Sequence, residues 1–414
     1  MGIAKSSAPT IVDVAIHAGV SRATASRAMG NYGRISEDTV AKVRKAAEEL
    51  GYRPNQVARA MRQGKTKTIG LVIIADFTNA FFDRATKAIV DAAKARGYQV
   101  LITNTDEEIE AERQAVETLL EKQVDGLIVV PSTALVHDHL SAAMTGRKPV
   151  VLIDRRVDGI SATSVTTDDF SGTDAAIRHA VSMGHHRMGF LIAAAGVKGF
   201  SEDRPAMLIS SVDDRVNGFL NGAADTGIKP KQQHWLYCED KPAISEAAVA
   251  KLLDTPKRPT IIFTSNNDMA LSVLKVAGNR QLVIGRDISL VTVDDSQWAA
   301  AMTPGITVVA RPVEDLGALA VDRLLSEINY PGRPTEKIIL PTDIVMASKF
   351  GADAEHVVAP ADALEDTAFG ATGMGLDIGP ETGKAFAEQI KAEQDHDDTS
   401  DDLQQSLPQP DLAG

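Results

Sequence analysis

Polar residues with ligand-binding chemistry recur at one kind of place in this sequence, directly after short apolar runs. Asp154 and Arg155 follow one such run, Asn266 follows a second, and Asp294 follows a third. Apolar runs that alternate with helix-length amphipathic stretches predict parallel strands covered by helices on both faces. In such sheets, ligands bind beyond the carboxyl ends of the strands. We therefore expect these side chains to line a binding site.

The region that contains these runs is long enough for two lobes. The region 68–350 holds seven near-continuous apolar runs, most of them separated by amphipathic stretches such as 82–97, 170–183 and 312–328. A region of this length exceeds what one hydrophobic core comfortably holds, so it should divide into two lobes. The sequence predicts an α/β fold in which a two-lobed, doubly wound domain binds a ligand.

Residues that could support catalysis or hold a metal are few and badly placed. His137 and His139 lie two apart in a segment expected to be helical, where such residues do not share a face, so solvated or capping histidines are the better interpretation. Cys238 is the only cysteine, which excludes a disulfide framework and a cysteine zinc site. The glycine-rich segment 370–375 has no strand before it, so it is a negligible phosphate-loop candidate. We expect no enzyme, no catalytic residue, no metal ligand and no cofactor.

Charge is distributed unevenly along the chain. Residues 1–67 contain twelve lysines and arginines against five acids, whereas residues 351–414 contain fifteen acids against two lysines, within a net charge of −13. A basic head on an acidic body is typical of proteins that bind a polyanion, although a merely solubilising surface is an alternative. No apolar run approaches the roughly 18–20 residues of a membrane span. The N-terminus lacks the apolar stretch of a secretory signal, so a cytoplasmic protein is expected.

The basic head is predicted to form three short helices. Thr10 caps the first, Gly19 ends it, Ser21 caps a second over 22–29, and Ser36 caps a third. A second helix that follows immediately after a glycine turn has the spacing of a helix-turn-helix motif. Cations on the second helix favour DNA binding over a three-helix scaffold without a ligand.

Four segments follow from this pattern: a head over 1–53, a hinge helix and linker over 54–67, the two-lobed domain over 68–350 and an acidic tail over 351–414. The hinge segment is too short to be a stable helix alone in water. It needs a partner chain or DNA, unless it is a frayed interdomain linker. The tail has few large apolar residues and should be largely disordered.

The sequence resembles the lactose/galactose repressor (LacI/GalR) family of bacterial transcription regulators over about residues 9–350. The most specific matches are the segments 10–15, 18–28 and 49–55 of the head. Looser matches lie at 154–155, 184–190, 215–219 and 294–295. The resemblance implies a helix-turn-helix head joined to a two-lobed sensor of the type I periplasmic-binding-protein fold.

For the head, the resemblance implies that the second helix lies in the major groove, where Arg22 could pair with guanine. Two hinge helices, one from each subunit, would place Met61 in the minor groove at the centre of a palindromic operator. Met61 stands where leucine is usual in the family, and Ala25 and Gly30 also depart from its pattern, so the operator sequence does not transfer. The implied DNA-binding residues are Thr10, Ser21, Arg22, Ala23, Thr24, Ser26, Arg27, Arg34, Asn55, Ala58 and Met61.

For the sensor, the resemblance implies a set of effector-binding residues whose aromatic faces, carboxylates, amide groups and guanidinium groups suit a sugar. They are Asn79, Phe81, Phe82, Asp154, Arg155, Arg215, Asn266, Asp294 and Arg311. Other interpretations stay open. Phe81 and Phe82 could be core residues, Asn266 could be a helix cap, and the arginines Arg155 and Arg215 could only form ion pairs with Asp154 and Asp213.

Two departures from the family bear on the effector. Arg311 stands where glutamine is usual in relatives that bind neutral sugars, and Asn267 stands where aspartate is usual. A pocket that gains a cation and loses an anion favours a sugar acid or sugar phosphate over a neutral sugar.

The resemblance as a whole implies a homodimeric transcription factor, a repressor of carbohydrate-metabolism genes. Its partners would be palindromic operator DNA, a second copy of the chain and a carbohydrate or sugar-acid effector bound between the lobes. The alternatives are an enzyme, a sugar-binding receptor without regulatory DNA binding, and a nonspecific chromatin-like DNA binder. The basic head and the missing signal sequence argue against the receptor.

Overall fold

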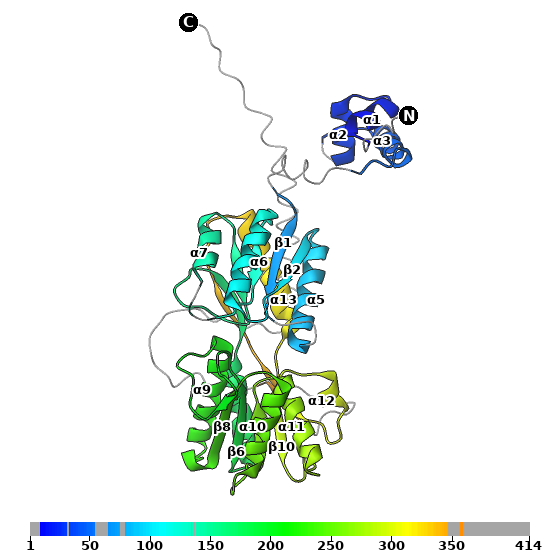
Figure 1. The fold of residues 1–414 in the computed structure, drawn as a ribbon. Coiled ribbons are helices and arrows are strands. Elements are labelled where there is room, and N and C mark those ends of the chain that lie inside the picture. The colour runs from blue at the N-terminus through cyan, green and yellow to red at the C-terminus, as the bar shows by residue number, and fades with distance from the viewer. Residues whose placement is uncertain are drawn as a thin grey trace, which may run out of the picture. The chain divides into compact units, whose positions relative to one another are not determined.

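The computed structural model describes residues 9–30, 33–53, 65–74, 79–133, 135, 137–346 and 357–358. Its head consists of α1 (Ile11–His17), α2 (Arg22–Gly30) and α3 (Glu37–Glu49) (Figure 1). Thr10 caps α1 as predicted, because its side chain accepts a hydrogen bond from the Asp13 amide while the Asp13 carboxylate accepts one from the Thr10 amide. A core of small apolar side chains holds the three helices together, with Val14, Ala25, Ala28 and Val43 almost fully buried.

A parallel sheet of six strands forms the centre of the first lobe, called here the N-lobe. Its order is β12 (Lys337–Leu340), β5 (Thr163–Thr167), β4 (Val150–Ile153), β3 (Leu127–Val129), β1 (Thr68–Ile73) and β2 (Gln99–Asn104). One face packs on α5 (Ala80–Ala95) and α13 (Val313–Asn329). The other packs on α6 (Ile109–Glu121) and α7 (Asp138–Thr145).

A second sheet forms the centre of the C-lobe. Its order is β14 (Val357–Val358), β13 (Asp343–Val345), β11 (Thr307–Ala310), β10 (Ser289–Val293), β9 (Ile261–Thr264), β6 (Met188–Ala193), β8 (Gln233–Cys238) and β7 (Phe200–Ser201). The five strands from β11 to β8 are parallel, and the outer strands are antiparallel. Helices α8 (Asp169–Ser182) and α9 (Ser210–Asp225) cover one face, and α10 (Pro242–Asp254) and α11 (Asn267–Asn279) cover the other. The short helices α12 (Gln297–Ala301) and a 3-10 turn (Pro230–Gln232) lie in connecting segments.

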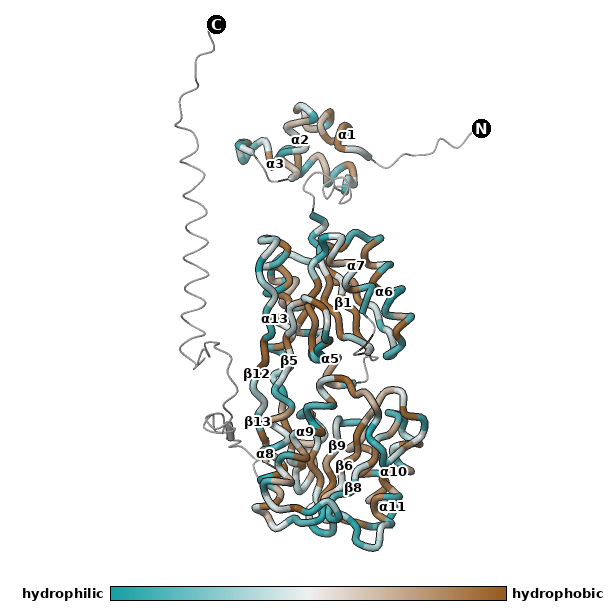
Figure 2. The backbone as a smooth tube through the Cα atoms, turned by 90° about the vertical axis from the view of Figure 1, so that its left-hand side faces the viewer, coloured by the Kyte–Doolittle hydropathy of each residue, from teal (hydrophilic) through white to brown (hydrophobic). Residues whose placement is uncertain are grey.

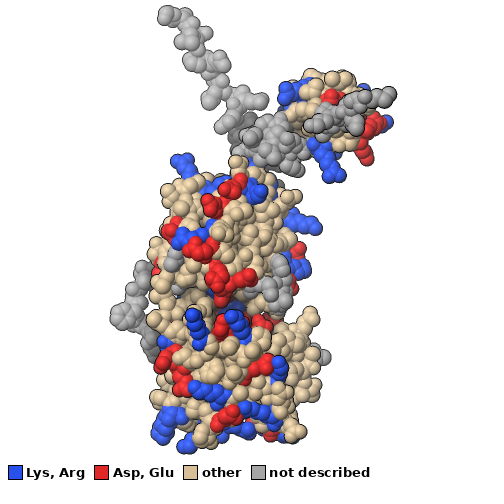
Figure 3. Space-filling model, in the orientation of Figure 1, with Lys and Arg blue, Asp and Glu red and all other residues tan. Residues whose placement is uncertain are grey.

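The apolar runs of the sequence become strands because both faces of each sheet are covered. All four residues of β4 and of β9 are buried, and Figure 2 shows the apolar strands inside each lobe. Acidic and basic side chains are interspersed over the visible surface of the lobes (Figure 3). No helix within the described ranges has the length and apolar character that crossing a membrane would need.

Two segments depart from the sequence expectations. The run 100–102 reads as a buried strand, but β2 is the edge strand of its sheet, so Leu101 and Ile102 are 40% and 38% exposed. The segment 351–414 reads as a disordered tail, but Val357–Val358 forms β14 and pairs with β13. The open edge of β13 offers backbone groups for this pairing, and the expectation that the tail is largely disordered stays a prediction.

The chain passes between the lobes three times. It leaves the N-lobe after β5 to begin α8, returns after β11 to begin α13, and leaves again after β12 to form β13. The three connections pack closely: the Thr342 hydroxyl donates to the Asp168 carbonyl oxygen at 3.0 Å. A Cβ placed on Gly172 would lie 2.3 Å from the Thr342 Oγ1 and 2.7 Å from Val309 Cγ1.

Candidate functional site

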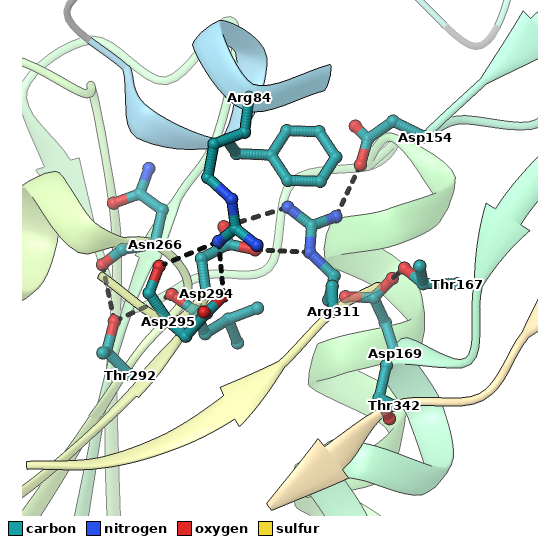
Figure 4. A network of polar contacts seen from close by, with 12 residues as sticks. Arg84, Asp154, Thr167, Asp169, Asn266, Thr292, Asp294, Asp295, Arg311 and Thr342 are labelled. Atoms are coloured by element: carbon teal, nitrogen blue, oxygen red, sulfur yellow. Dashed lines mark hydrogen bonds and ion pairs between the residues drawn. The ribbon is translucent and has the colours of Figure 1, made fainter. Parts of the chain in front are cut away.

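Arg311 joins the two lobes at the second connection. Its Nε and Nη2 donate to the two carboxylate oxygens of Asp294 at 2.6 and 2.9 Å, and its Nη1 donates to Asp154 Oδ1 at 2.6 Å (Figure 4). Asp154 directly follows β4 of the N-lobe and Asp294 directly follows β10 of the C-lobe. The guanidinium therefore links the carboxyl ends of one strand from each lobe, with only 3% of its side chain exposed.

The two aspartates share an unusual backbone conformation. Asp154 has φ of 64° and Asp294 has φ of 73°, in the left-handed region that favours glycine. A residue other than glycine in this region costs about 1–2 kcal/mol, although aspartate tolerates it better than most. Such strain persists where the surrounding structure requires it and is common at functional sites. Here it turns both carboxylates toward the same guanidinium.

Phe81 lies against the Arg311 guanidinium. The centre of the Phe81 ring is 3.7 Å from the Arg311 Cζ, a cation–π contact. Asn79 sets this position because its side-chain oxygen caps α5, accepting hydrogen bonds from the Phe81 and Phe82 amides. Phe82 packs edge to face on Phe81, with 5.0 Å between the ring centres, and belongs to the N-lobe core. Phe82 is therefore a core residue, as one of the two interpretations from the sequence supposed, whereas Phe81 also contacts Arg311 at the site.

Arg215 is held at the first connection between the lobes. Its Nε donates to Asp169 Oδ1 at 2.7 Å and its Nη1 donates to the Ser265 carbonyl oxygen at 2.7 Å. The Thr167 hydroxyl donates to the other Asp169 oxygen. Burial works to raise the pKa of Asp169, but the positive charges of Arg215 and Arg311 outweigh it and lower that pKa.

At Arg311, too, neighbouring charges outweigh the effect of burial on the pKa. Burial works to lower the pKa of the Arg311 guanidinium, but the carboxylates of Asp294, Asp154 and Asp169 outweigh burial and raise it above its usual value. Arg311 is therefore a permanently charged group whose charge is already matched by neighbouring carboxylates.

Arg155 is likewise paired. Its Nη2 donates to Glu107 at 2.5 Å and its Nη1 to the Pro131 carbonyl oxygen at 3.0 Å, while its Nε lies 3.5 Å from Asp154. Arg155 and Arg215 therefore form ion pairs, as one interpretation of the sequence supposed, but their main partners differ from those expected. The closer partner of Arg155 is Glu107 rather than Asp154. Arg215 takes Asp169 instead of the Asp213 considered from the sequence.

Asn266 has two tasks. Its side-chain oxygen caps α11 by accepting from the Met269 amide at 2.9 Å, as the helix-cap alternative supposed. Its amide nitrogen donates to Asp240 at 2.6 Å. Burial raises the pKa of Asp240 to about 6. From the N-lobe, the Asn79 amide reaches Asp268 at 3.5 Å, so the two predicted asparagines meet neighbouring acids of the C-lobe.

Arg84 was not singled out from the sequence, yet it also bridges the lobes. Its Nη1 donates to Asp295 at 2.6 Å, and its Nε and Nη2 donate to Glu314 at 2.8 and 2.7 Å. The hydrogen bonds to Glu314 raise the pKa of Arg84, against the opposing effect of burial. The only sequence signal was Asp295 beside Asp294, because the partners lie more than 200 residues from Arg84.

In the head, α2 presents a polar face. Arg22, Ala23 and Arg27 are exposed, whereas Ala25 and Ala28 are buried against the other helices. The Ser21 hydroxyl oxygen accepts from the Thr24 amide at 3.1 Å, so Ser21 begins this helix as predicted. The remaining head candidates are Thr10 at the cap of α1, the half-buried Ser26 and the exposed Arg34. Asn55, Ala58 and Met61 lie outside the described residues.

The histidine and cysteine side chains considered for catalysis are held by contacts within the fold. His139 Nε2 lies 2.6 Å from the buried Glu112, which also accepts from the Ser132 amide. Burial raises the pKa of the Cys238 thiol to about 12, which makes it a poor nucleophile. Over the ranges that the structure describes, no group of three or more histidine, cysteine or acidic residues could hold a metal ion.

Comparison with known proteins agrees with this architecture. The family described as bacterial regulatory proteins, lacI family, matches residues 10–55, and a periplasmic binding protein-like domain matches residues 177–346. Catabolite control protein A of Priestia megaterium is 30% identical over 80% of this chain and 96% of its own length. The lac repressor dimer bound to operator and the anti-inducer ONPF aligns with a TM-score of 0.70 at 25% identity, over 82% of this chain and 98% of that one.

A LacI family transcriptional regulator from Enterococcus faecium with bound ribose aligns with a TM-score of 0.59 at 25% identity, over 67% of this chain and 97% of that one. The resemblance and the fold class inferred from the sequence are thus confirmed. With its helix-turn-helix head and its two-lobed sensor, the chain belongs to the lacI family of bacterial regulatory proteins and is a DNA-binding transcriptional regulator.

Proposed function

We propose that this regulator is a homodimeric repressor of carbohydrate-metabolism genes, acting in the cytoplasm, that binds a palindromic operator and is not an enzyme. The observation that carries the DNA-binding part is the arrangement of α2, which exposes Arg22 and Arg27 while Ala25 and Ala28 anchor it to the head. An exposed arginine at the start of such a helix can make the bidentate contact with guanine in the major groove. Thr10, Ser21, Thr24, Ser26 and Arg34 would then contact phosphates and neighbouring bases.

Dimerisation is proposed from the edge of the N-lobe sheet. Leu101 and Ile102 on the edge strand β2 are exposed, and an exposed apolar edge strand needs covering to avoid uncontrolled association. A second copy placed on this edge would cover it. The related lac repressor is named as a dimer on its operator, which supports the same assembly here and, with it, the hinge contacts expected from Asn55, Ala58 and Met61.

For the effector, we propose a neutral carbohydrate bound between the lobes. The sequence favoured an anionic effector because Arg311 adds a cation and Asn267 replaces an aspartate, whereas the ion pairs of the arginines at the site support a neutral effector. Arg311 is neutralised by Asp154 and Asp294, while Asp169 neutralises Arg215 and Glu107 neutralises Arg155. An anion would have to displace these carboxylates, whereas sugar hydroxyls can both donate to carboxylates and accept from guanidinium groups.

The DNA-binding proposal is tested by selecting genomic fragments with the purified full-length protein and sequencing them. We expect enrichment of a short palindrome upstream of carbohydrate genes by wild type. The Arg22→Gln variant should lose this preference, whereas Lys122→Gln, a change of the same charge on an exposed residue of the N-lobe, should keep it. If no palindrome is enriched, or if Arg22→Gln enriches the same one equally well, the proposed recognition is wrong.

The effector proposal is tested by titration calorimetry with matched pairs: ribose and ribonate, glucose and gluconate, galactose and galactonate. A neutral sugar should bind, its acid should bind at least tenfold more weakly, and Asp294→Asn should abolish binding. Asp91→Asn, which changes an exposed carboxylate paired with Lys87, should leave binding intact. Tight binding of an acid in preference to its neutral sugar would contradict the proposal.

A further inference from the structure

A cavity lies at the amino ends of the N-lobe strands, opposite the carboxyl ends that Asp154 follows. It has a volume of about 650 Å³ and is lined by residues that precede strands: Lys65 before β1, Asp125 before β3 and Lys148 before β4. The interlobe site lies at the carboxyl ends of the strands, whereas this cavity lies at their amino ends. The two sites are therefore separate, and none of the predicted effector-binding residues lines this cavity.

The cavity is lined by four cations, Lys65, Arg147, Lys148 and Arg333. Three of them donate to neutral oxygens: Lys65 to the Asn329 side chain at 2.7 Å, Lys148 to the Val124 carbonyl at 2.7 Å, and Arg333 to the Ser326 hydroxyl at 2.9 Å. Among the residues placed by the structure, none of the four forms an ion pair with a carboxylate. Their charges are thus free to act on a ligand.

The two carboxylates in the cavity wall are engaged elsewhere. Asp125 accepts from the backbone amides of Thr66 and Lys67 at 2.8 and 2.9 Å, and Glu327 accepts from the Thr163 hydroxyl at 2.5 Å. Burial also raises the pKa of Glu327. Four cations against two acids leave the cavity with a positive potential, and a concave wall concentrates that potential on a bound ion.

Arg147 reaches the cavity from a strained position. It has φ of 63° at the end of α7, in the left-handed region, although Gly146 stands one residue earlier in the chain. A side chain in this region costs about 1–2 kcal/mol relative to glycine. This conformation closes the end of α7, where the Arg147 and Lys148 amides donate to the Met144 and Ala143 carbonyl oxygens, and the turn brings both residues to the cavity wall.

We propose that this cavity binds a small phosphate monoester. A dianion matches the excess of two positive charges, and guanidinium and ammonium groups are the side chains that bind phosphate oxygens most strongly. The volume lies in the range of small-ligand pockets, about 300–1,000 Å³. Met144 and Ile328 add apolar surface to the wall, which suits the carbon skeleton of such a metabolite. The four cations converge on one cavity rather than lying along an extended track, an arrangement that fits a small molecule better than the backbone of DNA.

The cavity also touches the segment that connects the lobe with the head. Lys65 precedes β1, and Asp125 holds the next two residues through their backbone amides. A phosphate bound by Lys65 would therefore hold the start of this connection. The proposed site thus gives the sensor a second input, independent of the interlobe effector.

The test is titration calorimetry of the full-length protein with ribose 5-phosphate and with inorganic phosphate, using ribose as the uncharged control. We expect one phosphate site per chain, with affinity that falls as salt rises. The double variant Arg147→Gln and Arg333→Gln should bind ribose 5-phosphate at least tenfold more weakly. The matched double variant Lys122→Gln and Lys257→Gln, which removes the same charge elsewhere on the surface, should bind like wild type.

Several results would overturn the proposal. One is the absence of binding by both phosphate probes, and another is equal weakening by the two double variants, which would indicate nonspecific attraction. Loss of ribose 5-phosphate binding in Asp294→Asn but not in the Arg147 and Arg333 variant would place the ligand between the lobes. If neither phosphate probe binds while the Arg147 and Arg333 variant has lower affinity for duplex DNA, these residues contact DNA instead. None of these readouts depends on finding the operator.

Discussion

Removing the guanidinium that joins the lobes should cost much of the stability of the sensor. Arg311→Met keeps an apolar side chain of similar length over Phe81 but leaves Asp154 and Asp294 without their shared partner. Both carboxylates are about 5% exposed. Breaking a buried ion pair by deleting one partner typically costs about 3–5 kcal/mol, because the remaining charge stays buried. Asp294 would lose its guanidinium partner and Asp154 would keep only Arg155 at 3.5 Å, so we expect a loss within that range at pH 7.

The loss should shrink as the pH falls. Orphaned buried carboxylates take up protons more readily than they do in the unfolded chain, so protonation favours the folded variant. The folded state of the variant therefore binds more protons than its unfolded state between pH 7 and pH 5, and its stability rises relative to wild type in that window. Urea unfolding followed by tryptophan fluorescence measures this directly, since both tryptophans, Trp235 in β8 and Trp298 in α12, lie in the C-lobe.

Arg178→Met is the matched control. Arg178 also joins two aspartates, Asp174 and Asp225, but its side chain is 42% exposed. Exposed ion pairs contribute about 0–1 kcal/mol, so this variant should lose less than about 1 kcal/mol. If Arg311→Met loses no more than Arg178→Met, or if its loss is the same at pH 5 and pH 7, the buried-charge reasoning is refuted.

Three further changes test other parts of the structure. In the same urea unfolding experiment, Gly172→Ala should destabilise the sensor by about 1–3 kcal/mol, because the added methyl group would overlap the third connection between the lobes. The control Gly278→Ala places a methyl group in open space on α11 and should be neutral or slightly stabilising. The Cys238 thiol should react with a thiol reagent only after unfolding, since burial raises its pKa to about 12; rapid reaction in native buffer would contradict this. Asp125→Ala should cost about 1–3 kcal/mol by leaving two backbone amides without an acceptor and should speed proteolysis near Thr66; unchanged proteolysis would argue against this anchoring role.

The local features of the fold could be predicted from the sequence. Thr10 and Ser21 begin their helices as expected, because a cap depends on residues within three positions. The apolar runs became buried parallel strands, because covering both faces of a sheet demands apolar residues at every position. The run at Leu101 and Ile102 misled this reasoning, since periodicity does not reveal whether a strand lies at the centre or the edge of a sheet.

The arrangement of the site could be predicted only in part. The effector candidates Asp154, Asp294 and Arg311 do meet, and the position of the two aspartates directly after apolar runs predicted that they lie at the carboxyl ends of strands. Their charge balance could not be foreseen, since Arg311 pairs with a residue 157 positions away as well as one 17 positions away. Arg84 could not be predicted as a site residue for the same reason, because its partners Asp295 and Glu314 lie far away in the chain.

The sequence by itself determined the architecture: a basic helix-turn-helix head and a two-lobed α/β sensor whose polar residues follow the strands. These features rest on caps, turns and periodicity, which act over a few residues. Only the tertiary structure decided that the charge of Arg311 is neutralised and that Lys65, Arg147, Lys148 and Arg333 converge on one cavity. The physical reason is that electrostatic energy depends on distance and burial, and both are set by the packing of residues far apart in the chain.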